Sequence, residues 1–235
     1  MTNNNDKRYI ISTGASAKAK KWTPVELTHG ELISLLTKHT MGQKDGEAFV
    51  PGKLTGDGRR SNSNVQELHA LVLDIDDGTP TEELVAKVKE SGYEAVIHTT
   101  HSHLIDTSAI RKEAVDRHRE RHPEDGDAEL LTKLKGFRPE IVEDATVIEP
   151  KGVEDKNGKV GTELVFKHGP CPKHRVAFPL VEPFTVGEDR KAAAQLWEDF
   201  RAGLLKQLGL TGDKQTDDLS RLYYFPRHAE GKVYD

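Results

Sequence analysis

The chain of 235 residues contains a single cysteine, Cys171, and only two methionines and two tryptophans. One cysteine excludes an internal disulfide bond and any zinc or iron–sulfur centre that needs several thiolates. The sequence also has no apolar run of membrane-spanning length, and residues 1–6 lack the apolar core of a signal peptide. We therefore expect a cytoplasmic protein with no membrane partner.

An excess of positive charge is also missing. The 34 lysines and arginines are outnumbered by 39 aspartates and glutamates, which gives a formal net charge of −5. A protein that binds nucleic acid through bulk charge is usually basic, so any such binding must use a local patch. The 35% of hydrophobic residues fit one globular domain over residues 1–235, and we expect residues 1–8 to be a disordered tail.

The most informative feature present is the run Ala70–Gly78, in which an apolar stretch ends in three carboxylates. Alternation along a strand places Asp74 and Asp76 on the same side. Two carboxylates held this close repel each other, and a shared divalent cation relieves the repulsion. Carboxylate oxygens are hard ligands, so the run predicts a site for Mg²⁺ or Mn²⁺.

A strand–helix–strand unit surrounds this acidic run. Residues 81–91 have a helical apolar stripe, and residues 95–100 form a second apolar strand that leads into His101-Ser102-His103. A right-handed crossover makes the two strands parallel, so we expect the acids and the histidines at one edge of the sheet.

The remaining pattern predicts an α+β fold, a mixed sheet with flanking helices and an N-terminal αβ unit. Residues 104–149 are densely charged and are expected to form a helical insertion. Its basic side chains either form a solvated face or contact a nucleic-acid backbone: Arg111, Lys112, Arg117, Arg119 and Arg121. A hairpin at Asn157-Gly158, a helix over 189–208 that ends before Gly209, and strands at 174–180 and 220–226 complete the prediction.

Four short motifs occur in a recognisable order. They are Leu71-Val72-Leu73-Asp74-Ile75-Asp76, then Thr99-Thr100-His101-Ser102-His103, then the strand at 174–180 with Arg175, and Asp213 followed eight positions on by Arg221. This order resembles the archaeo-eukaryotic primase superfamily, specifically the primase-polymerases of phages and plasmids. The resemblance covers residues 22–226, and the departure from the family is the long segment between His103 and Arg175.

The resemblance implies an RRM-like catalytic core and a DNA primase and DNA polymerase activity with two divalent ions. Asp74, Asp76 and Asp213 would hold the metal, and His103 would donate a hydrogen bond to the incoming triphosphate. The nucleotide-binding residues would be His101, Ser102, His103, Arg175 and Arg221, and Arg59 with Arg60 would contact DNA. The implied partners are a single-stranded DNA template, dNTP or NTP substrates, and a C-terminal or separate helicase, in phage or plasmid replication within a bacterial host.

Several assignments stay open. The motif histidine is His101 or His103, the third metal ligand is Asp213, Asp217 or Asp218, and Arg175 pairs with a carboxylate or with phosphate.

The main rival function is a phosphatase of the haloacid dehalogenase type. In that reading Asp74 is the nucleophile, Asp76 the acid, Thr99 or Ser102 a phosphate ligand, Lys173 the charge stabiliser, and Asp213 part of the metal motif. A rolling-circle nicking enzyme with Tyr223 or Tyr224 as nucleophile and a non-catalytic nucleotide-binding module are further alternatives.

Overall fold

The computed structural model of the chain describes residues 7–154, 158, 160–212 and 218–232. The chain divides into two compact units. The first unit takes residues 1–75, 81–101 and 174–235, and the second takes residues 76–80 and 102–173. Most of the expected disordered tail, residues 1–6, lies outside the described residues, but Arg8 already belongs to the first strand.

The first unit is built on a four-stranded sheet with the order β5-β6-β11-β7. Its strands are β5 (Gly52–Leu54), β6 (Val65–Ile75), β11 (His174–Thr185) and β7 (Val96–Thr99). Both β6 and β7 run antiparallel to β11, so they are parallel to each other, as the crossover rule predicts. The sequence did not indicate that β11 would lie between them.

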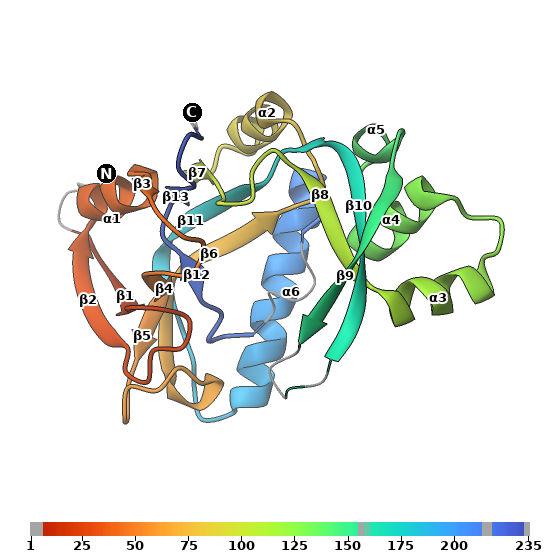
Figure 1. The fold of residues 1–235 in the computed structure, drawn as a ribbon. Coiled ribbons are helices and arrows are strands. Elements are labelled where there is room, and N and C mark those ends of the chain that lie inside the picture. Colours follow the sequence, from red (N-terminus) through yellow and green to blue (C-terminus); the bar gives the residue numbers. More distant parts are fainter. Residues whose placement is uncertain (1–6, 155–157, 159, 213–217, 233–235) are drawn as a thin grey trace. The chain divides into compact units, whose positions relative to one another are not determined.

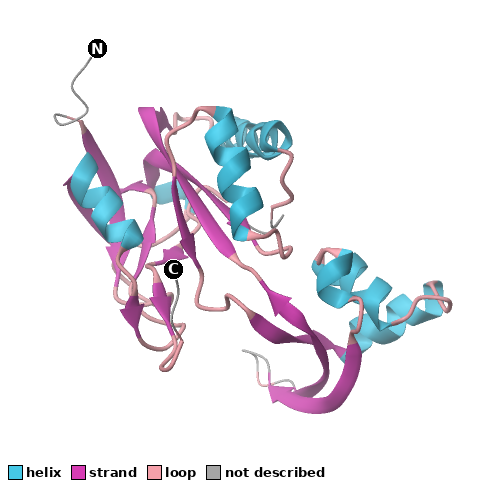
Figure 2. Ribbon diagram, turned by 90° about the horizontal axis from the view of Figure 1, so that it is seen from above, coloured by secondary structure: helices cyan, strands magenta, loops and turns pink. Residues whose placement is uncertain are grey.

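The two faces of this sheet bury different residues. Leu71, Leu73 and Ile75 pack into a core with the apolar sides of α2 (Thr81–Ser91) and α6 (Arg190–Leu208). Val72, which points the other way, joins a second core with α1 (His29–Thr37). Figures 1 and 2 show α2 and α6 on one side of the sheet and α1 on the other.

A second antiparallel sheet covers the α1 side of the first unit. Its order is β12-β4-β1-β2, formed by Tyr223–Tyr224, Ala48–Val50, Arg8–Gly14 and Thr23–Thr28. A short 3₁₀ turn, Asn62–Asn64, precedes β6, and β3 (Thr40–Met41) pairs in parallel with β13 (Arg227–His228).

Local signals in the sequence explain where two helices begin and end. Glu31 N–H donates to the Thr28 hydroxyl at 3.2 Å, and Thr28 N–H donates to the Glu31 carboxylate at 2.7 Å, so α1 starts with a capping box. Asp189 caps α6 by accepting from Ala192 N–H at 2.9 Å. The same helix ends at Gly209, whose φ of +58° is the left-handed conformation that glycine adopts without strain.

The second unit contains more strand than the sequence suggests. The helical insertion expected over 104–149 has three helices, α3 (Lys112–Arg121), α4 (Asp127–Lys135) and α5 (Pro139–Val142). It also has an antiparallel sheet with the order β8-β10-β9, formed by Ile105–Arg111, Val160–Cys171 and Thr146–Glu154. The expectation of a purely helical segment was therefore wrong, whereas the predicted hairpin pairing is present between β9 and β10.

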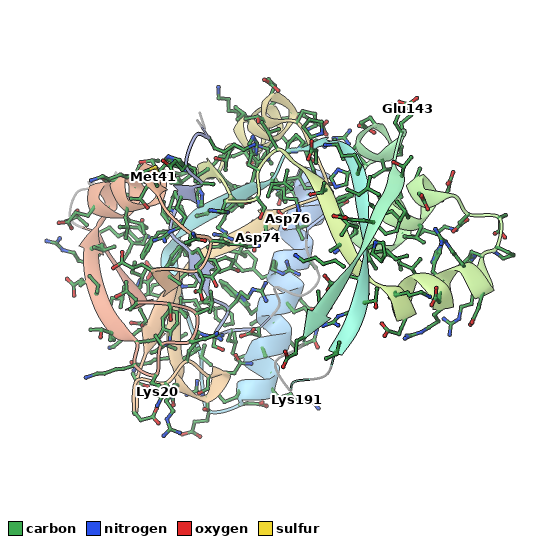
Figure 3. All side chains as sticks on the ribbon, in the orientation of Figure 1. Lys20, Met41, Asp74, Asp76, Glu143 and Lys191 are labelled. Atoms are coloured by element: carbon green, nitrogen blue, oxygen red, sulfur yellow. The ribbon has the colours of Figure 1, made fainter. Side chains whose placement is uncertain are left out.

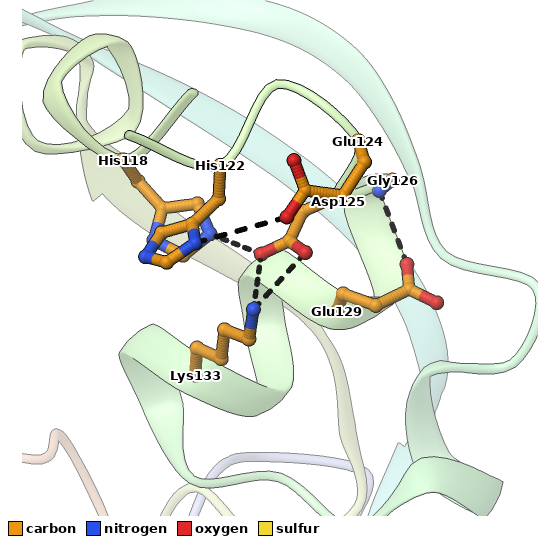
Figure 4. Close-up of polar contacts among 7 residues, drawn as sticks. All are labelled: His118, His122, Glu124, Asp125, Gly126, Glu129 and Lys133. Atoms are coloured by element: carbon orange, nitrogen blue, oxygen red, sulfur yellow. Dashed lines mark hydrogen bonds and ion pairs between the residues drawn. The ribbon is translucent and has the colours of Figure 1, made fainter. Parts of the chain in front are cut away.

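Charged residues of the second unit are largely paired with one another. The Asp125 carboxylate accepts from His118 Nε2 and from Lys133 Nζ, both at 2.7 Å, and this joins the end of α3 to α4 (Figure 4). The Lys133 ammonium, and then His118, hold the pKa of Asp125 below its usual range. Arg119 similarly bonds Asp127 at 2.8 Å. This local pairing favours the interpretation of the basic run as a solvated face.

Candidate functional site: a buried Asp74–Arg175 pair

The strand β6 carries Asp74 to the side of the sheet that faces β12. Asp74 alternates with Leu73 and Ile75, which are buried against α2 and α6, so its carboxylate lies on the opposite face. The Tyr223 hydroxyl, on β12, donates to Val72 O at 3.2 Å on this face. The carboxylate therefore lies in an enclosed environment, with the Asp74 side chain 10% exposed.

Arg175 is the direct partner of Asp74. The two residues are opposite each other in the β6–β11 register, and Arg175 Nε donates to Asp74 Oδ1 at 2.7 Å. The guanidinium also donates from Nη1 to Tyr224 O at 2.9 Å and lies 5.0 Å from the centre of the Tyr223 ring. In this structure Arg175 therefore pairs with a carboxylate, that of Asp74, and its contact with phosphate stays a prediction.

The surroundings of this pair are poor in water. Burial raises the pKa of the Tyr223 hydroxyl, and the nearby Asp74 charge raises it further, so this tyrosine is a neutral hydrogen-bond donor. An unpaired charge would be strongly unfavourable at such a site, whereas a paired carboxylate and guanidinium satisfy each other.

His98 extends the same row of side chains on β7. It lies opposite Arg175 in the β11–β7 register, so Asp74, Arg175 and His98 form a line across three strands. Burial, followed by the positive charge of Arg175, lowers the pKa of His98 to about 3, and its imidazole is therefore neutral. Its Nδ1 lies 3.1 Å from Thr99 O, and its ring is 6.2 Å from that of His39.

His98 is a site residue that the sequence analysis missed. The available signal was His98 itself, a histidine inside an otherwise apolar strand. Its alternation with Ile97 and Thr99 places it on the face that carries the charge of Arg175 on β11. That signal required knowing that β11 lies beside β7.

The turn after β6 belongs to the second unit, and Asp77, Gly78 and Thr79 have structural contacts. Asp77 Oδ1 accepts from Thr79 N–H at 2.9 Å and from the Thr79 hydroxyl at 2.7 Å, while Arg138 N–H donates to Asp77 O at 2.9 Å. Gly78 has a φ of +95°, and a side chain there would collide with Ile141. Asp77 therefore shapes the turn that follows Asp76.

The expected histidine motif divides between the two units. His101 lies in the first unit, where its Nε2 is 3.1 Å from Gly42 O. Ser102 and His103 lie in the second unit, and Lys173 N–H donates to His103 Nδ1 at 3.0 Å. Burial lowers the pKa of His103, so its imidazole is neutral, and its Nδ1 also lies 3.1 Å from Lys173 O.

The third expected metal ligand is not among the described residues, because Asp213 and its alternative Asp217 both lie in the range 213–217. The remaining alternative, Asp218, accepts from the Ser220 hydroxyl at 2.9 Å, and its carbonyl accepts from Arg221 N–H at 3.1 Å. Across the described ranges no group of three histidine, cysteine, aspartate or glutamate side chains is arranged to hold a metal ion. Asp74 and Asp76 offer the oxygen donors that Mg²⁺ or Mn²⁺ requires, but they do not complete a site by themselves.

Arg59 and Arg60, the expected DNA contacts, lie in the loop between β5 and β6. Arg59 Nε bonds Asp57 at 2.9 Å on the surface. Arg60 Nη1 donates to Ser220 O at 3.1 Å, and its guanidinium lies 5.9 Å from the centre of the Trp22 ring.

Comparison with protein-family models, with curated proteins and with solved structures finds no match to this chain. Among the helices of the described ranges, none combines the length and apolar character required to cross a membrane. The function must therefore be argued from the residues and their arrangement.

Proposed function

We propose that this chain is a template-directed nucleotidyltransferase, a primase-polymerase of the archaeo-eukaryotic type that acts in phage or plasmid DNA replication. The observation that carries the proposal is Asp74 at the end of the central strand β6, with Arg175 beside it on the antiparallel neighbour. It is supported by the four motifs in the sequence, which occur in the order that this superfamily uses.

The topology of the first unit also supports an RRM-like core. The elements occur in the order β6, α2, β7, β11, α6, and the strand order is β6-β11-β7 with β5 on the outer side of β6. Both helices contribute to one core on one face of the sheet, and Asp74 lies on the opposite face, beside β12. A four-stranded sheet with two helices behind it is the general form of an RRM-like domain.

The proposed roles follow from the chemistry of each residue. A Mg²⁺ or Mn²⁺ pair, when bound by Asp74, Asp76 and Asp213, would activate the attacking 3′-hydroxyl and neutralise the triphosphate. Asp76, Ser102 and His103 belong to the second unit, and their proposed roles rest on the sequence motifs alone. A neutral imidazole has one N–H to donate, which is what the proposed hydrogen bond from His103 to a phosphate oxygen requires.

Arg175 has a more specific role than the sequence suggested. Its contacts with Asp74, Tyr223 and Tyr224 fix the direction of the Asp74 carboxylate. We therefore assign Arg175 as a positioning residue for Asp74. Arg221 and His101 remain proposed contacts of the nucleotide.

The decisive experiment is incorporation of labelled dNTP or NTP on a primed and on an unprimed single-stranded DNA template, with Mg²⁺ or Mn²⁺. The double variant Asp74→Ala/Asp76→Ala should lose at least about 100-fold in rate, since metal ligands act on the developing charge. The control is Glu90→Gln, which removes a negative charge at an exposed position on α2 and should keep full activity.

Two other results would contradict the proposal. Hydrolysis of a generic phosphomonoester, without incorporation of nucleotide, would point to the haloacid dehalogenase alternative with Asp74 as nucleophile. Nucleotide binding without release of pyrophosphate would indicate a non-catalytic module.

A further inference from the structure

A hollow in the first unit is lined by basic side chains and lies apart from the Asp74–Arg175 pair. Two loops form it, residues 15–22 between β1 and β2 and residues 55–61 before β6. Its volume is about 520 Å³, and four of its six lining residues are cations: Lys18, Lys20, Arg59 and Arg60. Figure 3 shows Lys20 at an end of the first unit well away from Asp74.

The charge of these loops is opposite to that of the whole chain. Residues 15–22 and 55–61 contain five lysines and arginines and one acid, Asp57, whereas the chain has a net charge of −5. Asp57 is paired with Arg59, but the described residues offer no ion-pair partner to Lys18 or Lys20, both of which are exposed. The hollow therefore has a surplus of positive charge that faces solvent.

The two loops are held in place by buried Trp22. Its N–H donates to Gly58 O at 2.8 Å, which joins one loop to the other, and its indole N–H donates to Ala19 O at 3.1 Å. Arg60 packs over the same indole and bonds Ser220 O. Because the backbone of the two loops is already fixed, little backbone entropy is lost when an anion binds there.

We propose that this hollow binds the phosphodiester backbone of single-stranded DNA. A groove lined by cations is the arrangement that follows the phosphate backbone of a single strand, and four of the six residues that line this hollow are cations. Trp22 is only 1% exposed and cannot stack on a base, so binding is electrostatic and insensitive to sequence. The assignment rests on the proposed function, because it names the surface that holds the template.

The connection to the Asp74 site runs through residues 218–224. Arg60 bonds Ser220 O, and Ser220 N–H donates to Asn62 at 2.9 Å, so this segment is fixed to the loop that carries the cations. Four residues further on, Tyr224 O accepts from Arg175. A DNA strand that binds at the hollow therefore contacts a part of the first unit that is hydrogen-bonded, through residues 218–224, to Arg175.

The test is fluorescence anisotropy with labelled dT20 and dA20 over 25–200 mM KCl, with EDTA and without nucleotide. The wild-type chain should bind both oligonucleotides with similar affinity. Each phosphate neutralised on a single strand contributes about 0.7 to the slope of log K against log salt. The variant Lys18→Gln/Lys20→Gln should therefore lower the slope by about 1.4 and weaken binding roughly 25-fold at 0.1 M salt.

The matched control is Lys89→Gln/Lys191→Gln, which removes the same charge from exposed positions on α2 and α6. An equal loss of affinity in both double variants would overturn the proposal, since only net charge would matter. So would an absence of salt-dependent binding, or tighter binding of duplex DNA through the same lysines. Because EDTA blocks any metal-dependent reaction, these results are independent of whether the chain incorporates nucleotide.

Discussion

The Asp74–Arg175 pair allows a quantitative test of how the site is held together. In the variant Arg175→Met the Asp74 carboxylate, which is 10% exposed, stays in the sheet without its counter-charge. Removing one partner of a buried ion pair costs about 3–5 kcal/mol. The lost bond to Tyr224 O and the lost contact with the Tyr223 ring are part of the same change, so we expect a total near 4 kcal/mol.

The double variant Asp74→Asn/Arg175→Met separates charge from packing. It removes both charges while keeping side chains of similar volume, so it should recover about 2 kcal/mol or more of that loss. The control is Arg8→Met. Arg8 forms a long, exposed pair with Glu26 at 3.8 Å, and its loss should cost less than about 1 kcal/mol.

Urea unfolding followed by tryptophan fluorescence is the appropriate assay. The only tryptophans in the sequence, Trp22 and Trp197, are both buried in the core of the first unit, so the signal reports the unit that contains the pair. A loss below 1 kcal/mol for Arg175→Met would refute the reasoning. The free energy of unfolding is also measured for Asp74→Asn alone. If the loss in the double variant equals the sum of the losses in the two single variants, the two residues are not coupled.

Two further predictions concern pH and backbone conformation. Because the folded pKa of His98 is about 3, the unfolded chain binds a proton between that pH and 6.5 that the folded chain does not bind, so the free energy of unfolding rises with pH in this window and is level above it. At pH 5 the loss relative to pH 7 should be about 2 kcal/mol in the same urea assay, and a His98→Asn variant that keeps the full pH dependence would contradict the assignment. Gly78→Ala should destabilise the second unit by more than about 1 kcal/mol, because φ is +95° and the new Cβ would lie 2.5 Å from Ile141 Cγ1. Thermal unfolding by circular dichroism checks this, with Gly152→Ala, where the Cβ meets nothing within 4 Å, as a control that should have little effect.

Elements with strong local signals could be predicted from the sequence. The glycine after α6 and the apolar run of β6 depend on neighbouring residues only, and each is present as expected. The capping box at Thr28 is a local signal of the same kind. The strand β8, Ile105–Arg111, was missed because it alternates small and polar residues inside a charged segment and depends on pairing with β10, more than fifty residues later.

Part of the Asp74–Arg175 site could be named from the sequence, but its arrangement could not. Asp74 and Arg175 were both named, but their pairing follows from a register between strands a hundred residues apart, which periodicity does not encode. For the same reason the sequence did not connect His98 or Tyr223 with Asp74. The assignments of metal ligands and nucleotide contacts are still predictions.

The two ends of the segment 102–173 are hydrogen-bonded to each other. Leu104 N–H donates to Cys171 O at 2.9 Å, and Lys173 N–H bonds the His103 ring, so the two ends of the segment 102–173 are fixed near each other. Bringing the ends of a flexible loop of this length together would cost roughly 2–3 kcal/mol more than closing a loop of a few residues. Once the segment 102–173 is folded, β7 and β11 are joined by a short effective connection. The entropy cost of pairing these strands then depends little on how many residues lie between them.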